Sequence, residues 1–185
     1  ARHAKPRPII VMHILVTGGA GFIGTHTVIE LLAAGHRPIV LDNLVNSSAE
    51  AIERVARITG ERVPLHRVDL FDRAAVERVF DAQPIDAVMH FAGLKAVGES
   101  TREPLRYYHN NLTGTLHLLE TMRARGVRRL VFSSSATVYG DPERVPIPET
   151  ARLQATNPYG NTKLFVEEFC RGLAAAEGGW RIALL

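Results

Sequence analysis

The sequence is short of cysteine, lysine and aromatic residues, and each shortage excludes something. Cys170 is the only cysteine among 185 residues, so no internal disulfide can form, and the sequence predicts a protein of the reducing cytoplasm. Aromatic residues make up 6% of the chain and the arginines are scattered, so no basic stripe predicts nucleic-acid binding. The eight histidines form no metal-ligand cluster with Cys170 or with carboxylates, and we predict no metal site.

The scarcity of lysine makes the lysines that are present informative. Of the 22 Lys+Arg residues, only Lys5, Lys95 and Lys163 are lysine, and the net charge is +3. Arginine is always charged, whereas lysine is a compact charge that changes its pKa readily on burial. A lysine that falls within a motif is therefore a candidate site residue.

One charge-free stretch, residues 8–29, imitates a membrane span or an export signal. The glycine-rich run Thr17–Gly21 in its middle would break an apolar helix, so we interpret the stretch as a strand, a turn and a helix and predict no membrane contact. Met12 resembles a natural start. We therefore expect residues 1–11 to be an N-terminal extension and residues 12–185 to form the domain.

Strand and helix patterns alternate along the chain. Short apolar runs predict strands at Ile9–Val16, Pro38–Leu41, Val63–Val68, Ala87–Phe91, Arg129–Ser133 and Arg181–Leu185. Amphipathic patterns predict helices at Phe22–Ala34, Ala49–Thr59, Ala74–Asp81, Pro104–Arg125 and Tyr159–Glu177. This alternation predicts right-handed βαβ units and an α/β fold, a Rossmann-type doubly wound parallel sheet.

The first motif is the glycine-rich segment from Gly18 to Gly24, which reads GGAGFIG. It follows an apolar strand and opens an amphipathic helix, the context in which such glycines bind a dinucleotide. Gly18, Gly21 and Gly24 would let the backbone approach a pyrophosphate, and the helix N-terminus would offer it free N–H groups. The alternative is a glycine turn without a ligand.

Two acidic residues follow predicted strands. Asp42 lies 18 residues after Gly24, a spacing at which a carboxylate can bind both ribose hydroxyls of NAD and repel the extra phosphate of NADP. Asp69, followed by Leu70, comes directly after the third predicted strand and would lie beside the adenine. Each aspartate also has a simpler interpretation as a turn residue.

Tyr159 and Lys163 form a pair at positions i and i+4, which project from one face of a helix. A free tyrosine has a pKa of about 10, and bringing it to neutrality requires about 4 kcal/mol of phenolate stabilisation. One positive charge at ~4 Å supplies about that much at an effective dielectric constant near 20. The alternative is a tyrosine packed on a lysine stem. The nearby run Ser133–Ser135 ends a predicted strand, and Ser135 could share a proton with Tyr159.

Together these motifs resemble the extended short-chain dehydrogenase/reductase family, and within it the UDP-glucose 4-epimerases. The resemblance runs from Met12 to Leu185. It also rests on further blocks, which are Leu41–Leu44 with Asn46 and Ser47, His90–Ser100, Tyr107–Tyr108, Asn110–Asn111 and Ser133–Gly140.

The resemblance implies roles for individual residues. Tyr159 would be the catalytic base, Lys163 its activator, and Ser135 the proton-sharing partner. A UDP-sugar would contact Lys95, Ser135, Thr137 and Tyr159. The cofactor NAD would contact Gly18, Gly21, Phe22, Ile23, Gly24, Asp42, Asn43, Leu44, Val45, Asn46, Ser47, Asp69, Leu70, Phe91, Ala92, Gly93, Leu94, Lys95, Asn110, Ser135, Tyr159 and Lys163.

The implied reaction is NAD-dependent interconversion of UDP-glucose and UDP-galactose at C4, through a 4-keto intermediate, in a protein that forms a homodimer. Alternatives are an epimerase of another UDP-sugar and a nucleotide-sugar 4,6-dehydratase, which would need an acidic pair where Ala136 and Thr137 stand. A third is a truncated, non-catalytic NAD-binding module. Family members continue well beyond the sixth strand, so we expect the substrate domain to be largely absent from this chain. By itself, the chain should bind NAD weakly and be poorly active.

Overall fold

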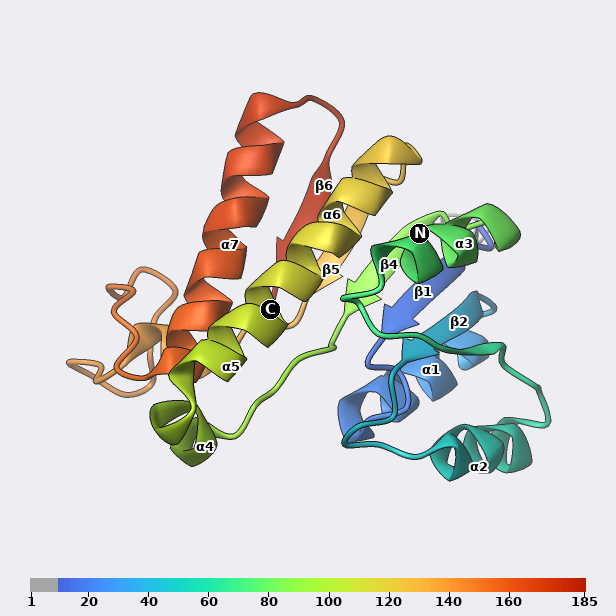
Figure 1. Cartoon of the computed structure of the whole chain (residues 1–185), viewed down its shortest axis with the longest axis horizontal. Helices are drawn as coiled ribbons and strands as arrows, with labels where there is room; N and C mark the ends of the chain where they lie inside the picture. Colours follow the sequence, from blue (N-terminus) through green and yellow to red (C-terminus); the bar gives the residue numbers. More distant parts are fainter. Residues whose placement is uncertain (1–9) are drawn as a thin grey trace, which may run out of the picture.

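The computed structural model describes residues 10–185, which form one six-stranded sheet with helices on both faces (Figure 1). All neighbouring strands are parallel, in the order β3-β2-β1-β4-β5-β6. This is the strand order of the Rossmann fold, so the predicted fold class is confirmed. Most of the predicted extension, residues 1–9, lies outside the described residues. Across residues 10–185, no helix is long and apolar enough to span a membrane.

All six predicted strands are present with adjusted bounds. They are β1 His13–Thr17, β2 Arg37–Asp42, β3 Leu65–Arg67, β4 Ala87–His90, β5 Arg129–Phe132 and β6 Arg181–Leu184. Ile9, the predicted start of the first strand, lies outside the described residues, and the predicted strand residues 10–12 precede β1. The pairing of β1 with β2 begins at His13, and the preceding Ile10 and Val11 are 78% and 52% exposed.

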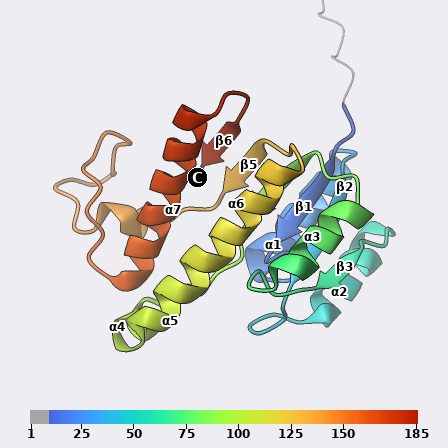
Figure 2. The same cartoon turned by 45° about the horizontal axis from the view of Figure 1, so that its top comes forward.

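The helices include the predicted ones and some that the sequence pattern did not indicate. They are α1 Phe22–Ala33, α2 Ala49–Thr59, α3 Arg73–Ala82, α4 Val97–Arg102, α5 Pro104–Tyr108, η1 His109–Thr113, α6 Gly114–Ala124, η2 Ala136–Tyr139 and α7 Pro158–Ala176. The predicted helix Pro104–Arg125 is α5 and α6 joined by the π-helical turn η1. Figures 1 and 2 show this joined helix running beside α7.

The core consists of two apolar layers, one on each face of the sheet. Successive residues of a strand point to opposite faces. Leu15 of β1 therefore packs in the layer beneath α3, α6 and α7, whereas its neighbours Ile14 and Val16 pack in the layer beneath α1 and α2. The doubly covered strands leave the carboxyl end of the sheet as the place where loops can form a site.

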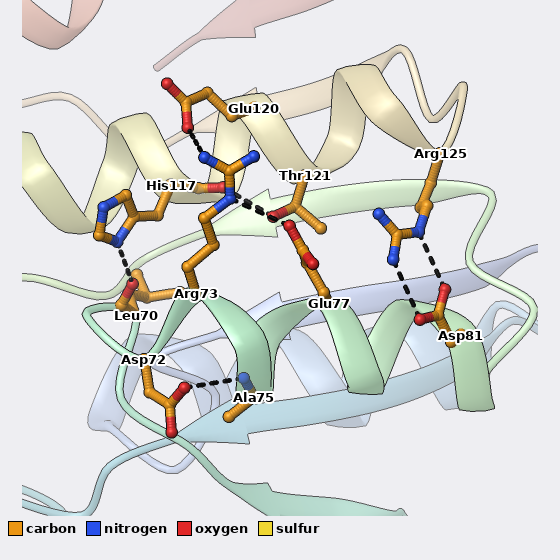
Figure 3. A network of polar contacts seen from close by, with 10 residues as sticks. All are labelled: Leu70, Asp72, Arg73, Ala75, Glu77, Asp81, His117, Glu120, Thr121 and Arg125. Atoms are coloured by element: carbon orange, nitrogen blue, oxygen red, sulfur yellow. Dashed lines mark hydrogen bonds and ion pairs between the residues drawn. The ribbon is translucent and has the colours of Figure 1, made fainter.

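Ion pairs on the surface join α3 to α6 (Figure 3). Arg125 donates two hydrogen bonds to Asp81, at 2.9 and 3.0 Å, and Arg73 contacts Glu120 at 2.6 Å. Such exposed pairs are screened by water and contribute little to stability. They add little to the burial that holds α6 on the sheet, where its N-terminal end borders the groove described next.

Candidate active site

A groove with a volume of about 540 Å³ runs along the carboxyl ends of the strands. It crosses the boundary between β1 and β4, where the chain reverses its winding direction and such sheets bind ligands. The predicted site residues that line it are Gly18, Gly21, Phe22, Ile23, Gly24, Asp42, Asn43, Val45, Asn46, Asp69, Leu70, Phe91, Ala92, Gly93, Leu94, Lys95, Asn110, Ser135, Tyr159 and Lys163.

Close backbone approaches explain the glycines of the first turn. Gly18 has φ +67°, and a Cβ there would lie 2.6 Å from the backbone nitrogen of Ala92 in the loop after β4. A Cβ at Gly24 would lie 2.4 Å from the carbonyl oxygen of Gly18. The turn therefore packs tightly against both α1 and the β4 loop, and only glycine fits at these positions.

The N-terminus of α1 is open toward the groove. Gly21 at its N-cap supplies no side-chain hydrogen bond, whereas Ser48, Asp72 and Asn157 cap α2, α3 and α7 with theirs. Phe22 in the first turn of α1 is 75% exposed. The free N–H groups and the positive end of the helix dipole make this turn suited to an anionic group.

Asp42 is fixed in place by the turn around it. Asp42 is 6% exposed, and its carboxylate accepts hydrogen bonds from the Ala20 and Leu44 amides, at 3.0 and 2.9 Å, and from the Ser47 hydroxyl at 2.8 Å. An ionised carboxylate has about four acceptor positions, so capacity for a ligand hydroxyl remains. Leu44 and Ser47, which we predicted as cofactor contacts, donate to Asp42 but are not among the groove-lining residues.

Tyr159 and Lys163 lie in the first turns of α7. Lys163 is 7% exposed, and its Nζ donates a hydrogen bond to the Ser133 carbonyl at 2.8 Å and lies 5.9 Å from the centroid of the Tyr159 ring. Burial lowers the pKa of Lys163 to about 8. The ammonium is therefore mostly charged at neutral pH, buried in the wall of the groove and beside the Tyr159 ring.

The three consecutive serines after β5 have three different roles. The carbonyl of Ser133 accepts from Lys163, the hydroxyl of Ser134 donates to Glu167, and the Oγ of Ser135 accepts from the amide and hydroxyl of Thr137 at 3.2 and 2.9 Å. Among the described residues, no direct hydrogen bond joins Ser135 to Tyr159. Thr137, predicted to contact substrate, donates to Ser135 but is not among the groove-lining residues.

Asn111 is a structural part of the groove that the sequence analysis missed. Its side chain is buried, and its Nδ2 donates to the Leu94 carbonyl at 2.9 Å and to the Thr162 hydroxyl at 3.0 Å, while its Oδ1 accepts from the Leu94 amide at 2.8 Å. It thereby ties the β4 loop to α7. The pair Asn110–Asn111 was one of the blocks that carry the family resemblance, but only Asn110 was predicted as a cofactor contact. The groove-lining residues that were not predicted are Leu41, Val68, Phe71, Arg106, Asn111, Thr115, Ser133 and Ser134.

His90 lies beneath the groove and is 1% exposed. Its ring nitrogens contact the Thr17 hydroxyl at 2.6 Å and the Thr115 hydroxyl at 2.9 Å. Burial, with a smaller contribution from the Lys163 charge, lowers the pKa of His90 to about 3. The imidazole is therefore neutral near pH 7 and joins the end of β1 to α6. Within residues 10–185, no group of histidine, cysteine or carboxylate side chains is arranged to hold a metal.

Comparison with known proteins gives long matches to one group of enzymes. The chain is 60% identical over 174 residues to the UDP-glucose 4-epimerase of Bacillus subtilis, which covers 94% of this chain and 51% of that protein. It is 56% identical over 172 residues to the enzyme of the same name from Dictyostelium discoideum, covering 93% and 50%. The chain therefore spans about half the length of the curated relatives it matches.

Solved structures agree with the sequence matches. The UDP-glucose 4-epimerase of Bifidobacterium longum, in complex with NAD+ and UDP, superposes with a TM-score of 0.91 at 53% identity, over 93% of this chain and 52% of that one. The enzyme of Thermus thermophilus, in complex with NAD, gives 0.85 at 38% identity, over 94% and 54%. Residues 14–185 match the model of the NAD dependent epimerase/dehydratase family, and the chain belongs to that family.

Proposed function

We propose that this chain is the NAD-binding part of an enzyme that interconverts UDP-glucose and UDP-galactose by epimerisation at C4. The observation that carries the proposal is the buried Lys163 ammonium beside Tyr159, in the same groove as the open first turn of α1. The names of the similar proteins support the substrate. The proposed NAD-binding domain is residues 12–185, preceded by an extension of residues 1–11.

The groove suits NAD along its length. The free amides at the start of α1 fit a pyrophosphate, and the remaining acceptor position of Asp42 fits a ribose hydroxyl while disfavouring a phosphate on that ribose. Asp69 and Leu70 line the groove after β3, where the adenine would lie. At the end of the groove where α7 begins, Lys163 would donate a hydrogen bond to the nicotinamide ribose of NAD.

The chemistry of the proposed reaction follows from the α7 residues. Tyr159 would take the proton of the sugar 4-hydroxyl, and Ser135 would share that proton. Lys163, whose Nζ lies 5.9 Å from the centroid of the Tyr159 ring, would supply the positive charge beside this base. Bound NAD would supply the reversible hydride transfer at C4 that inversion of this carbon requires. Lys95, exposed on the groove wall, would approach the UDP-sugar.

The whole protein is proposed to act in the cytoplasm as a homodimer. Leu105 of α5, Leu116 of α6 and Phe165 of α7 are 81%, 40% and 44% exposed, and Phe165 packs near Tyr108 of α5. These apolar side chains support a partner surface on the helices that run side by side in Figure 1. Sedimentation of the whole protein tests this, and a monomer would contradict it.

The test of the proposed activity is Tyr159→Phe in the whole protein, with UDP-galactose as substrate. We expect kcat to fall by about 100-fold or more, with NAD affinity nearly unchanged, since only the proton-transferring hydroxyl is removed. Tyr139→Phe, the same chemical change in η2 outside the groove, is the matched control and should leave turnover intact. Unimpaired turnover in Tyr159→Phe would remove the base assignment. Conversion of UDP-N-acetylgalactosamine but not UDP-galactose would overturn the proposed substrate.

The isolated chain is proposed to bind NAD weakly and to have little activity, because it spans about half of its relatives. Incubating the purified 185-residue chain with NAD and UDP-galactose tests this statement. Robust formation of UDP-glucose would contradict it.

A further inference from the structure

A buried carboxylate lies one helical turn beyond Lys163. Glu167 of α7 is 5% exposed, although Val166 and Cys170 of the same helix belong to the hydrophobic core. One of its oxygens accepts a hydrogen bond from the Ser134 hydroxyl, and the other accepts from Arg171 at 2.7 Å. A carboxylate is removed from water at a high cost unless it is paired, so this contact to Ser134 is a specific feature of the fold.

Glu167 and Lys163 hold the same loop at adjacent residues. Lys163 donates to the carbonyl of Ser133 at 2.8 Å, and Glu167 accepts from the hydroxyl of Ser134. The next residue along the loop is Ser135, whose hydroxyl lines the groove. Helix α7 therefore attaches to the loop through one donor and one acceptor, spaced by one turn, directly before the proposed proton-sharing serine.

We propose that Glu167 is a positioning residue of the active site. Through Ser134 it fixes the loop after β5, so that the Ser133 carbonyl remains on Lys163 and the Ser135 hydroxyl remains at the groove. This positioning role of Glu167 rests on the proposed function, because the proposed function gives Lys163 and Ser135 their roles. Glu167 itself touches neither the groove nor the reacting atoms.

The chain offers variants that separate positioning from general stability. Ser134→Ala removes the contact to Glu167 without changing any charge. Glu167→Ala removes the carboxylate, and Glu167→Gln keeps an oxygen that can accept from Ser134. Glu168→Gln is the matched control, because Glu168 pairs with the same Arg171 at 2.7 Å but is an exposed residue of α7 with no contact to the loop.

The readout is the titration of Lys163, followed by NMR in protein labelled with ¹³C-lysine. The chain has three lysines, Lys5, Lys95 and Lys163, so the spectrum is simple and Lys163→Met assigns the relevant signal. Burial holds the pKa of Lys163 at about 8 in the intact site. A loosened loop admits water, so the titration midpoint should rise by about one pH unit or more toward its ordinary value.

We expect the Lys163 midpoint to rise in Ser134→Ala and in Glu167→Ala. In Glu167→Gln and in Glu168→Gln it should stay at the wild-type value. An unchanged midpoint in folded Ser134→Ala would overturn the positioning role, even if its melting temperature falls, because a merely structural contact would lower stability alone. NAD titration of the same proteins separates the two proposals. Wild-type protein that fails to bind NAD contradicts the proposed function, whereas the lysine midpoint still decides the role of Glu167.

Discussion

Helices α1 and α7 both begin at the groove, but they begin in opposite ways. The first turn of α1 has no side-chain cap and presents the exposed Phe22. The first turns of α7 are closed by Asn157, whose Oδ1 accepts from the Gly160 amide at 2.8 Å, and they bury Lys163. One helix meets the groove with backbone groups, and the other meets it with side chains.

This difference assigns the two proposed tasks of the site to different helices: α1 binds the pyrophosphate, and α7 carries the proton-transfer residues. Backbone amides and a helix dipole recognise a fixed anion such as a pyrophosphate, and they need glycines so that the ligand can approach. Proton transfer needs a side chain with a tuned pKa, which in turn needs burial and fixed neighbours. The three predictions that follow test each half of this comparison and the residue that joins them.

The largest effect is expected where the backbone of α1 is closest to its turn. Gly24→Ala places a Cβ about 2.4 Å from the Gly18 carbonyl, so the turn must move. We expect a loss of about 3 kcal/mol in the free energy of unfolding and loss of measurable NAD binding. Gly172→Ala in α7 is the matched control, since a Cβ there has nothing within 4 Å. It should stabilise the chain by about 1 kcal/mol.

Urea unfolding and NAD titration of both alanine variants measure this contrast. If Gly24→Ala binds NAD as the wild type does, the claim that the first turn of α1 binds NAD through its backbone is contradicted. If Gly172→Ala loses as much stability as Gly24→Ala, the close backbone approach at Gly24 does not explain the loss.

An intermediate effect is expected from His90, which contacts the end of β1 before α1 and senses the charge of Lys163 on α7. Its pKa is about 3 in the folded protein and about 6.5 in the unfolded chain. The unfolded state therefore binds a proton below pH 6.5 that the folded state does not. Stability is full above pH 6.5 and falls by about 1.4 kcal/mol per pH unit as the pH decreases toward 3.

Urea unfolding between pH 6.5 and 5.5 measures this slope above most of the range in which carboxylates titrate. His66, whose pKa burial also lowers, contributes with the same sign, so the slope must be compared between wild type and His90→Gln. We expect the variant to have a clearly shallower slope. Equal slopes in the two proteins would contradict the claim that folding keeps His90 neutral between β1 and α6.

The smallest effect is expected at the cap of α7. Asn157→Ala removes the hydrogen bond to the Gly160 amide and should cost about 1 kcal/mol of stability. Because α7 carries Tyr159 and Lys163, NAD affinity should fall as well. Ser48→Ala removes the cap of α2 and should lower the melting temperature without changing NAD affinity. Equal NAD affinities for these variants would contradict the claim that the cap serves the site.

The two halves also differed in how far sequence could predict them. The turn before α1 depends on local backbone geometry, so the spacing of Gly18, Gly21 and Gly24 was enough to place it at the groove. The spacing of Tyr159 and Lys163 likewise placed both on one face of α7. What spacing could not show is the contact of a side chain with a distant segment.

The missed contacts around α7 are all of that long-range kind. Asn111 bonds to Leu94 and Thr162, which are 17 and 51 residues away, and Ser134 bonds to Glu167 across 33 residues. No periodic pattern connects such positions. Helix α4 was missed for a related reason, since its start is held by the Ala96 amide donating to the hydroxyl of the buried Tyr107 at 3.1 Å.

NMR titration of the chain with ADP and then NAD tests the central claim most directly, and it suits weak binding. ADP carries the adenosine and the pyrophosphate but lacks the nicotinamide ribose. The account predicts that both ligands shift the amide signals of Phe22 and Ile23 at the start of α1, and that only NAD shifts the side-chain signal of Lys163 on α7. Saturating NAD that leaves Phe22 and Ile23 unshifted, or ADP that shifts Lys163 as strongly as NAD does, would contradict it.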